Sequence, residues 1–408
     1  MKYCLIGEKL GHSYSKIIHT YCGLDYSIVQ LNKDELENFL TNCEYDGFNV
    51  TIPYKKEVMK YLSYISPEAE KIGAVNTVVN KNGKLYGYNT DIGGLESMIK
   101  STFVSLKDKN VLVLGSGGAS STACALANIN NAKSVTVVSR NGEINYTNCY
   151  ELKDTEIIIN ATPCGMSPKV DESPIDLSKF KSLKGVYDCI YNPQNTNLIL
   201  QAKSLKIPCA SGLKMLVVQA LLAQEIWLNK SHDQIKEKEI FNFVKNQTTN
   251  IVLSGMPSSG KSTIAKALSK VLNLEYFDSD EYIVKKYNKT PSEIILSQGE
   301  KAFRDIESEA IAVLSNKKGV IISLGGGGVL RNKNVINLKR NGVIYYIDRP
   351  IEKLIDKDRP LSKQKGVKAL YGERKDIYEN TCDFKVKNNT TIEDCVKEII
   401  SIYENISY

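Results

Sequence analysis

A glycine-rich turn near the middle of the chain has the clearest chemical purpose in the sequence. Residues 255–262 read GMPSSGKS and fit the pattern GxxxxGKS/T at every fixed position, after the apolar run 250–253 and before an amphipathic stretch. Glycines let successive backbone N–H groups face phosphate oxygens. Lys261 adds a cation near the β and γ phosphates, and Ser262 offers a hydroxyl to Mg²⁺. The turn therefore predicts a nucleoside triphosphate site.

A second glycine-rich turn, GSGGAS at residues 115–120, follows the apolar run 110–114. A helix that begins after such a turn can bind a pyrophosphate, but Ser120 replaces the third glycine of GxGxxG, so a tight turn without a ligand is the alternative. The next apolar run ends in Ser139 and Arg140, where an NAD site would carry Asp or Glu for the ribose 2′-hydroxyl. Arginine at this place favours a 2′-phosphate, and thus NADP over NAD.

The elements that must position these turns alternate between short β-rich runs and longer helical patterns, which indicates an α/β fold. We predict two sets of buried parallel strands, each opening with its own glycine turn, at residues 110–114, 134–138 and 157–160 and at residues 250–253, 320–324 and 343–347. Between the sets, residues 231–249 are polar at both ends with an amphipathic piece at 235–244. We place a domain junction near residues 246–249.

Composition narrows the class of protein. The chain has 408 residues, of which 42% are hydrophobic and 24% charged, values that exclude disordered, collagen-like and coiled-coil chains. The net charge of +7 comes mostly from lysines interleaved with acidic side chains. We interpret it as a solvated surface that suits small anionic ligands, and we expect no nucleic-acid partner.

Three features indicate a cytoplasmic protein without a membrane partner. The ten cysteines show no CxxC spacing and are accompanied by only three histidines, which indicates reduced thiols and no zinc site. No run reaches the ~18 apolar residues of a membrane span. The apolar run at the N-terminus is too short for a signal peptide.

Further motifs follow the triphosphate-binding turn in a fixed order. They are FDSD at residues 277–280, FRDIE at 303–307, GGGG at 325–328, DRPL at 358–361 and RKDIY at 374–378. This ordered set resembles shikimate kinase over essentially the whole length from Thr249 to Tyr408. The segment between Arg359 and Arg374 is short for that family.

The kinase resemblance implies ATP with Mg²⁺ and shikimate as ligands, and it implies a role for each matching residue. Asp280 would act as or near the general base, and Lys261 and Arg359 would stabilise the transferring phosphoryl group. Mg²⁺ would be held by Ser262 and Asp278. The ATP-binding residues would be Gly255, Ser258, Ser259, Gly260, Lys261, Ser262, Thr263 and Arg359. The shikimate-binding residues would be Asp280, Arg304, Gly326, Gly327 and Arg374, with both arginines on the carboxylate.

The first part of the chain carries its own dispersed motifs. They are GEKLGHSYSKIIH at residues 7–19, GFNVTIPYK at 47–55, IGAVNT at 72–77, GYNTDIGG at 87–94, NATPCGM at 160–166, DCIYNPQNT at 188–196 and GLKM at 212–215. Together they resemble shikimate dehydrogenase over about residues 1–228. Lys16 stands where that family often has proline, and Ser-Arg-Asn replaces the common Asn-Arg-Thr of the cofactor loop.

The dehydrogenase resemblance implies a catalytic pair, Lys55 and Asp91. Reduction of a ketone by hydride places negative charge on its oxygen, so a cation that can give a proton must lie there, and Lys55 fits. The substrate-binding residues would be Ser13, Ser15, Thr51, Asn76, Tyr191 and Gln219, the two serines on the carboxylate. The NADP-binding residues would be Gly115, Gly117, Gly118, Ser139, Arg140, Gly212 and Met215.

We therefore expect an α/β protein with three lobes. Residues 1–100 would form a substrate-binding catalytic lobe, residues 101–245 a Rossmann lobe for NADP whose last helices, about 212–245, pack back on the first lobe, and residues 246–408 a P-loop kinase domain with a central parallel sheet. The implied function is the NADPH-dependent reduction of 3-dehydroshikimate and the ATP-dependent phosphorylation of shikimate, two steps of aromatic amino acid biosynthesis. We expect a monomer or a dimer.

Two alternatives stay open at this point. One is an NAD-linked dehydrogenase of the quinate/shikimate type, which an acidic residue in place of Arg140 would have favoured. The other is a nucleotide-binding regulator without catalysis, which the presence of Lys55, Asp91, Lys261 and Asp280 speaks against.

Overall fold

The computed structural model describes residues 1–11, 13–354 and 366–405 and divides the chain into two compact units, Met1–Val244 and Lys245–Tyr408. Helix α8 (Gln234–Thr248) crosses this division, so the residues around 246–249, where we expected a junction, are largely helical. Apolar side chains at Ile240 and Val244 are buried on the first unit's side of the helix, which explains why the helix does not end earlier. None of the described helices is long and apolar enough to cross a membrane.

The first unit begins with a mixed six-stranded sheet in the order β2-β1-β3-β5-β6-β4. Its strands are β1 (Lys2–Gly7), β2 (Asp25–Gln30), β3 (Gly47–Val50), β4 (Tyr64–Ile65), β5 (Thr77–Lys81) and β6 (Lys84–Tyr88). The helices of this part are α1 (Ser15–Tyr21), α2 (Leu36–Thr41), the 3-10 helix η1 (Glu57–Tyr61), α3 (Pro67–Ile72) and α4 (Asp91–Lys100).

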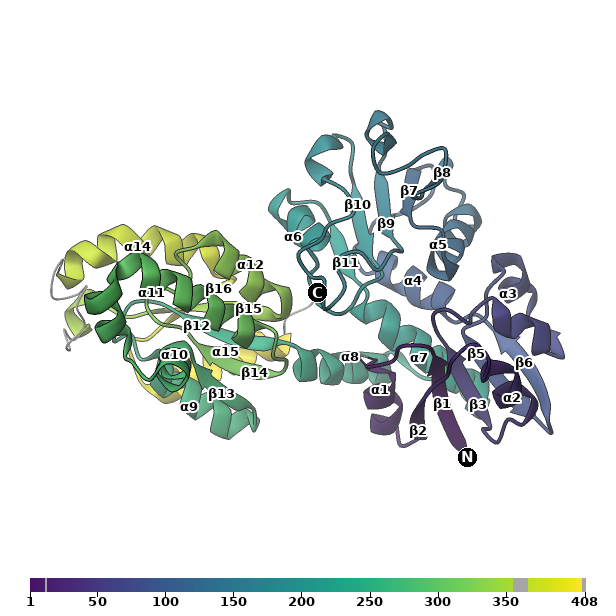
Figure 1. The fold of residues 1–408 in the computed structure, drawn as a ribbon, viewed down its shortest axis with the longest axis horizontal. Helices are drawn as coiled ribbons and strands as arrows, with labels where there is room; N and C mark the ends of the chain where they lie inside the picture. The colour runs from purple at the N-terminus through teal and green to yellow at the C-terminus, as the bar shows by residue number, and fades with distance from the viewer. Residues whose placement is uncertain (12, 355–365, 406–408) are drawn as a thin grey trace. The chain divides into compact units, whose positions relative to one another are not determined.

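A parallel five-stranded sheet in the order β11-β10-β9-β7-β8 completes the first unit. Its strands are β7 (Asn110–Leu114), β8 (Ser134–Val138), β9 (Ile157–Asn160), β10 (Gly185–Asp188) and β11 (Cys209–Ser211). The helices are α5 (Gly118–Ile129), η2 (Cys149–Glu151), η3 (Leu177–Lys179), α6 (Asn197–Ser204) and α7 (Leu213–Leu228). Figure 1 shows α4 and α7 between the two sheets, and Trp227 of α7 stacks on Tyr3 of β1.

The second unit is built on a parallel sheet in the order β13-β14-β12-β15-β16. Its strands are β12 (Asn250–Ser254), β13 (Glu275–Asp278), β14 (Val320–Ser323), β15 (Gly342–Asp348) and β16 (Phe384–Lys387). The helices are α9 (Lys261–Leu272), α10 (Ser279–Tyr287), α11 (Pro291–Ser315), α12 (Asn332–Asn341), η4 (Ile351–Lys353), α14 (Val367–Thr381) and α15 (Ile392–Asn405). One apolar cluster packs α11, α12 and α14 on one face, and another packs α9 and α15 on the opposite face.

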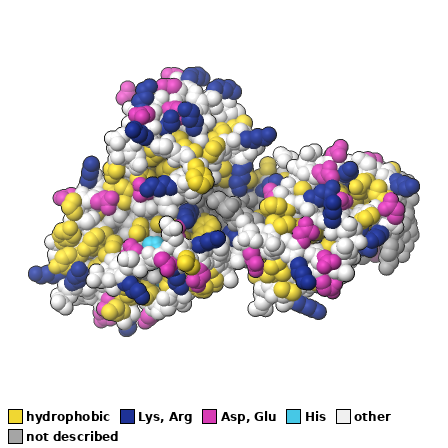
Figure 2. Space-filling view, turned by 180° about the vertical axis from the view of Figure 1, so that it is seen from behind, with side chains coloured by type: hydrophobic (Ala, Val, Ile, Leu, Met, Phe, Trp, Pro, Cys, Tyr) yellow, Lys and Arg dark blue, Asp and Glu magenta, His cyan; other side chains and the backbone are white. Residues whose placement is uncertain are grey.

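The predicted α/β class is confirmed, and all six predicted strands are present. One detail was wrong: the strand at residues 134–138 is not buried throughout. β8 is the edge of its sheet and pairs only with β7, so Ser134 and Val137 are exposed while Val138 is fully buried. Basic and acidic side chains intermix over the face drawn in Figure 2, as expected for a solvated surface.

Candidate active sites

A lysine–aspartate ion pair lies at the carboxyl edge of the first sheet. Lys55 is in the turn after β3, and Asp91 is the first residue of α4. Lys55 Nζ is 2.5 Å from Asp91 Oδ2, and the two side chains are 17% and 8% exposed. The N-terminus of α4 favours a carboxylate at this position. The pair is thus held in a largely desolvated place, with Lys55 the more exposed of the two side chains.

Asn76 fixes the other side of the aspartate. Its Nδ2 donates to Asp91 Oδ1 at 2.9 Å, and its Oδ1 accepts from the backbone N–H of Thr90 at 2.7 Å. Gln219 of α7 brings its Oε1 to 3.4 Å from the same Asn76 nitrogen. The structure therefore brings four predicted residues together, and Thr90 is a contributor that the sequence reasoning missed.

Close packing of α4 on α7 makes this arrangement possible. A Cβ added at Gly94 would lie 2.5 Å from the backbone oxygen of Met215, so no larger residue fits between the two helices. Met215 and Gln219 lie in the first two turns of α7. Their positions follow from the glycine contact rather than from any local preference of α7.

The predicted carboxylate-binding serines lie near Tyr191. Burial raises the pKa of Tyr191, and a hydrogen bond with Ser13 lowers it in part. Ser13 Oγ also accepts from the backbone N–H of Ser15 at 3.2 Å, and Ser15 itself is buried. Thr51 is half-buried at the end of β3 and donates its N–H to Ile6 at 3.0 Å. Ser13 and Tyr191 are therefore grouped, whereas Ser15 is buried and forms a hydrogen bond with Tyr26.

Asp188 supports the segment that carries Tyr191, a role that the sequence reasoning did not assign. This fully buried carboxylate accepts from Asn160 Nδ2 at 3.0 Å, from the N–H of Ile190 at 3.0 Å and from Thr196 Oγ1 at 2.6 Å. Burial raises the pKa of Asp188 to about 7, against the opposing effect of these hydrogen bonds. The sequence signal that could have indicated this role is the position of Asp188 as the acidic first residue of the motif DCIYNPQNT.

The glycine turn after β7 lies against Lys55. Gly118 is the first residue of α5, and a Cβ added there would lie 3.5 Å from Lys55 Cδ. Gly117 precedes it, with no atom within 4 Å of an added Cβ. An open cradle at a helix N-terminus fits a pyrophosphate, and Lys55 lies beside this cradle. The residues present thus fit NADP.

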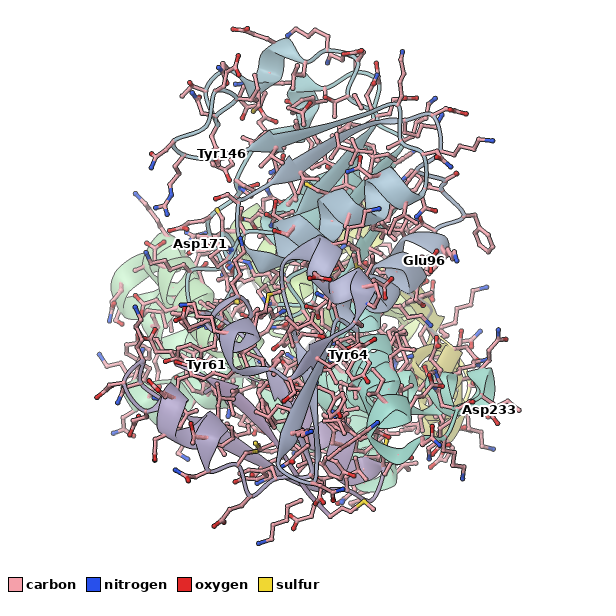
Figure 3. The ribbon with its side chains drawn as sticks, turned by 90° about the vertical axis from the view of Figure 1, so that its right-hand side faces the viewer. Tyr61, Tyr64, Glu96, Tyr146, Asp171 and Asp233 are labelled. Atoms are coloured by element: carbon pink, nitrogen blue, oxygen red, sulfur yellow. The ribbon has the colours of Figure 1, made fainter. Side chains whose placement is uncertain are left out.

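The residues predicted for the two ends of NADP lie on either side of this turn. Arg140 is exposed after β8, and its charge opposes the rise that burial causes in the pKa of Tyr146. Figure 3 labels Tyr146, which lies in the loop after β8. At the other side, a Cβ added at Gly212 would lie 2.2 Å from the backbone oxygen of Cys189, which only glycine permits. Ser139 is half-buried beside Arg140, and its N–H donates to Ile144.

In the second unit, the triphosphate-binding turn joins β12 to α9. Gly255 and Gly260 have φ values of +140° and +95°, which other residues rarely adopt. Lys261 Nζ donates to the backbone oxygens of Gly255 at 2.9 Å and Met256 at 2.8 Å, so its cation lies inside the turn. Ser258, Ser259 and Thr263 belong to the same turn and the first helical turn. Asn388, which follows β16, donates to the backbone oxygen of Ser259 at 2.8 Å and so holds the turn in place. The sequence motifs did not indicate this role of Asn388.

A carboxylate with two serine hydroxyls marks the predicted magnesium position. Asp278 Oδ2 accepts from Ser262 Oγ at 2.8 Å and from Ser323 Oγ at 3.0 Å. Its other oxygen accepts from the backbone N–H groups that begin α10. One carboxylate with hydroxyl neighbours suits Mg²⁺, which keeps waters and phosphate oxygens as its remaining ligands. Ser323 at the end of β14 was not anticipated.

The residues predicted to bind shikimate surround the GGGG turn. A Cβ added at Gly325 would lie 2.4 Å from Asp280 Oδ1, and one at Gly327 would lie 1.8 Å from Arg304 Nη1. Arg374 Nη1 donates to the oxygen of Gly326 at 3.2 Å. The turn thus collects one carboxylate and two guanidinium groups. Arg359, the other predicted arginine, lies outside the described residues.

Comparisons with known proteins find similarity to shikimate dehydrogenase in the first unit and to shikimate kinase in the second. A family model described as the shikimate dehydrogenase substrate binding domain matches residues 5–78, and one described as shikimate kinase matches residues 257–404. A shikimate dehydrogenase (NADP(+)) of Clostridium beijerinckii is 35% identical over 266 residues, which cover 60% of this chain and 98% of that relative.

Solved structures show the same similarity. Shikimate dehydrogenase 1 from Peptoclostridium difficile has 36% identity and a TM-score of 0.57, covering 60% of this chain and 98% of its own. A shikimate 5-dehydrogenase from Thermus thermophilus, solved in complex with NADP(H) and shikimate, has 26% identity and a TM-score of 0.54, covering 60% of this chain and 99% of its own.

Proposed function

This chain belongs to the shikimate dehydrogenase family through its first unit and carries a shikimate kinase domain in its second, and we propose that it catalyses two consecutive reactions. The first is the NADPH-dependent reduction of 3-dehydroshikimate to shikimate. The second is the ATP-dependent phosphorylation of shikimate to shikimate 3-phosphate. The product of the first unit is then the substrate of the second.

The observation that carries the proposal is the pairing of each glycine turn with groups that suit one hydroxy acid. Gly118 lies against Lys55 in the first unit, and Asp280 lies beside the GGGG turn with Arg304 in the second. NADPH supplies the hydride, and ATP with Mg²⁺ supplies the phosphoryl group. Both units thereby present a charged group at the place where the same small acid would react.

In the reduction, Lys55 donates a proton to the carbonyl oxygen on which negative charge develops. Asp91 keeps the Lys55 ammonium in place through its 2.5 Å contact, and Asn76 orients Asp91. Ser13 and Tyr191 would bind the carboxylate of the acid, and Gln219 a hydroxyl.

In the phosphorylation, Asp280 accepts the hydrogen of the reacting hydroxyl, while Arg304 and Arg374 bind the carboxylate. Lys261 places its cation in the turn where the phosphates would bind, and Asp278 with Ser262 would hold Mg²⁺. Both substrates are small molecules. We place the reactions in the cytoplasm, where the ten free cysteines would stay reduced.

The test is one reaction mixture that contains ATP, NADPH and 3-dehydroshikimate, with shikimate and shikimate 3-phosphate followed over time. Lys55→Ala should abolish NADPH oxidation and leave phosphorylation of added shikimate intact. Asp280→Asn should do the reverse, so that each activity is the folding control for the other. Full NADPH oxidation by Lys55→Ala would contradict the assignment of Lys55 as the proton donor. Full ADP formation by Asp280→Asn would contradict the assignment of Asp280 as the base.

A further inference from the structure

Two carboxylates of very different exposure bind the guanidinium group of Arg304. Glu307 Oε2 accepts from Nη1 at 2.7 Å, and this carboxylate is 1% exposed. Glu300 Oε1 accepts from Nη2 at 3.0 Å and from Nε at 3.3 Å, and its side chain is 45% exposed. Glu307 is therefore a built-in support of the arginine, whereas Glu300 reaches it from the solvent.

The charges around this guanidinium are already compensated. Among the described side chains at the GGGG turn, Arg304 and Arg374 are positive, and Glu300, Glu307 and Asp280 are acidic. The nearby Arg331 is paired with Asp305 at 2.6 Å. An incoming carboxylate gains little from an arginine whose charge is balanced, unless one of its partners leaves.

Glu300 is the partner that can leave. It follows Gly299, where α11 is interrupted by a non-helical residue with φ 86° and ψ 161°. A Cβ added at Gly299 would meet no atom within 4 Å, so the kink is open to solvent. Turning the half-exposed Glu300 side chain into water returns this carboxylate to solvent, and the buried Arg304 keeps its ion pair with Glu307. Moving Glu307 would leave a buried carboxylate unpaired.

We propose that Glu300 sets the affinity of the kinase site for a carboxylate: it occupies the Nε/Nη2 edge of Arg304 until the carboxylate of the incoming acid replaces it there. The inference rests on the proposed function, because it takes Arg304 as the group that binds the acid. Glu300 then competes with the acid and leaves a neutral analogue unaffected. Glu300 is a specificity-determining residue and takes no part in phosphoryl transfer.

Glu300→Gln removes the competing charge and keeps the size of the side chain. We expect the KM for shikimate to fall about three- to ten-fold, with kcat and the KM for ATP unchanged. The KM for the methyl ester of shikimate should stay the same, because the ester cannot replace Glu300 at the guanidinium. The readout is ADP formation without NADP⁺, so that the first unit does not consume shikimate.

Glu309→Gln is the matched control, since Glu309 lies on the same helix and pairs with Lys286 at 3.6 Å, away from the turn. It should leave both KM values unchanged. Glu300→Asp retains a carboxylate and should keep the KM for shikimate closer to that of the wild type than Glu300→Gln does.

Three results would overturn the inference. A higher KM for shikimate in Glu300→Gln would mean that Glu300 holds Arg304 in place for the acid. An equal change for acid and ester would point to a structural role, and no change at all would mean that the two carboxylates do not compete. Absence of ADP formation in the wild type would instead refute the proposed kinase activity itself, so the two failures are distinguishable.

Discussion

Replacing Gly327 by alanine tests how the second unit positions its arginine. A Cβ at this position would lie 1.8 Å from Nη1, 2.3 Å from Cζ and 2.6 Å from Nη2 of Arg304. Non-bonded contact between such atoms requires about 3.5 Å, so the guanidinium must move by roughly 1–2 Å. The ion pair with Glu307 breaks as well, because that buried carboxylate cannot follow.

The size of the effect follows from the bonds that are lost. Hydrogen bonds to a charged group are worth about 1.5–3 kcal/mol. Since 1.4 kcal/mol corresponds to a factor of ten, kcat/KM for shikimate should fall about 10- to 150-fold in Gly327→Ala. The KM for ATP should not change, because the triphosphate-binding turn keeps its own contacts.

The assay measures ADP formation at saturating ATP as shikimate is varied, with NADPH oxidation by 3-dehydroshikimate in the same preparation as the folding control. Gly328→Ala is the matched variant, because the nearest atom to its added Cβ is Leu324 Cβ at 3.1 Å, which requires a small adjustment. It should keep most of its activity. Wild-type kcat/KM in Gly327→Ala, or the same loss in both variants, would refute the assignment of Arg304 to the substrate carboxylate.

Three further predictions concern the first unit. Arg140→Gln should lower kcat/KM for NADPH about 10- to 100-fold and leave that for NADH unchanged, because only NADPH carries the 2′-phosphate; equal losses would contradict this role. Asp188→Asn should flatten the pH dependence of the free energy of unfolding. The pKa of Asp188 is about 7 in the folded state, so the free energy of unfolding of the wild type falls by up to a few kcal/mol as the pH rises from about 4 to 7. Urea titrations of both proteins across this pH range would show the difference. Gly94→Ala should lower the stability measured by thermal unfolding by about 1–2 kcal/mol, because the added Cβ would lie 2.5 Å from a backbone oxygen. The control Gly93→Ala should be neutral or stabilising, because its Cβ meets only the flexible end of Leu222. Equal effects of the two variants would show that α4 and α7 can separate freely.

Local patterns were sufficient to predict six of the strands and the two glycine turns. The apolar runs at residues 110–114 and 157–160 coincide with β7 and β9, because a central strand of a parallel sheet must be apolar on both faces. The run at 134–138 is also rich in valine, but its place at the edge of the sheet leaves Val137 exposed. The polar side chains at residues 246–248 suggested a linker, but helix α8 continues through these residues.

Two contributors that the sequence did not reveal, Ser323 and Asn388, have partners that are distant along the chain. Ser323 donates to Asp278 from the end of the neighbouring strand β14, and Asn388 donates to Ser259 from the end of β16, which β15 separates from β12. Serine and asparagine at strand ends are common, so nothing in their type distinguishes these two. Glu300 and Glu307 flank Arg304 on one helix, yet only burial shows that one is a fixed support and the other is exposed.

The sequence by itself determined the chemistry of this protein: which residues can bind phosphates, donate a proton or hold a carboxylate, and in which order they occur. This is possible because a phosphate-binding turn and the strand before it are specified by residues that are adjacent in the chain. Only the tertiary structure decided which of these groups meet. Lys55 faces Gly118, and Arg304 lies against Gly327, because sheet order and close helix packing, which depend on the whole chain, set those distances.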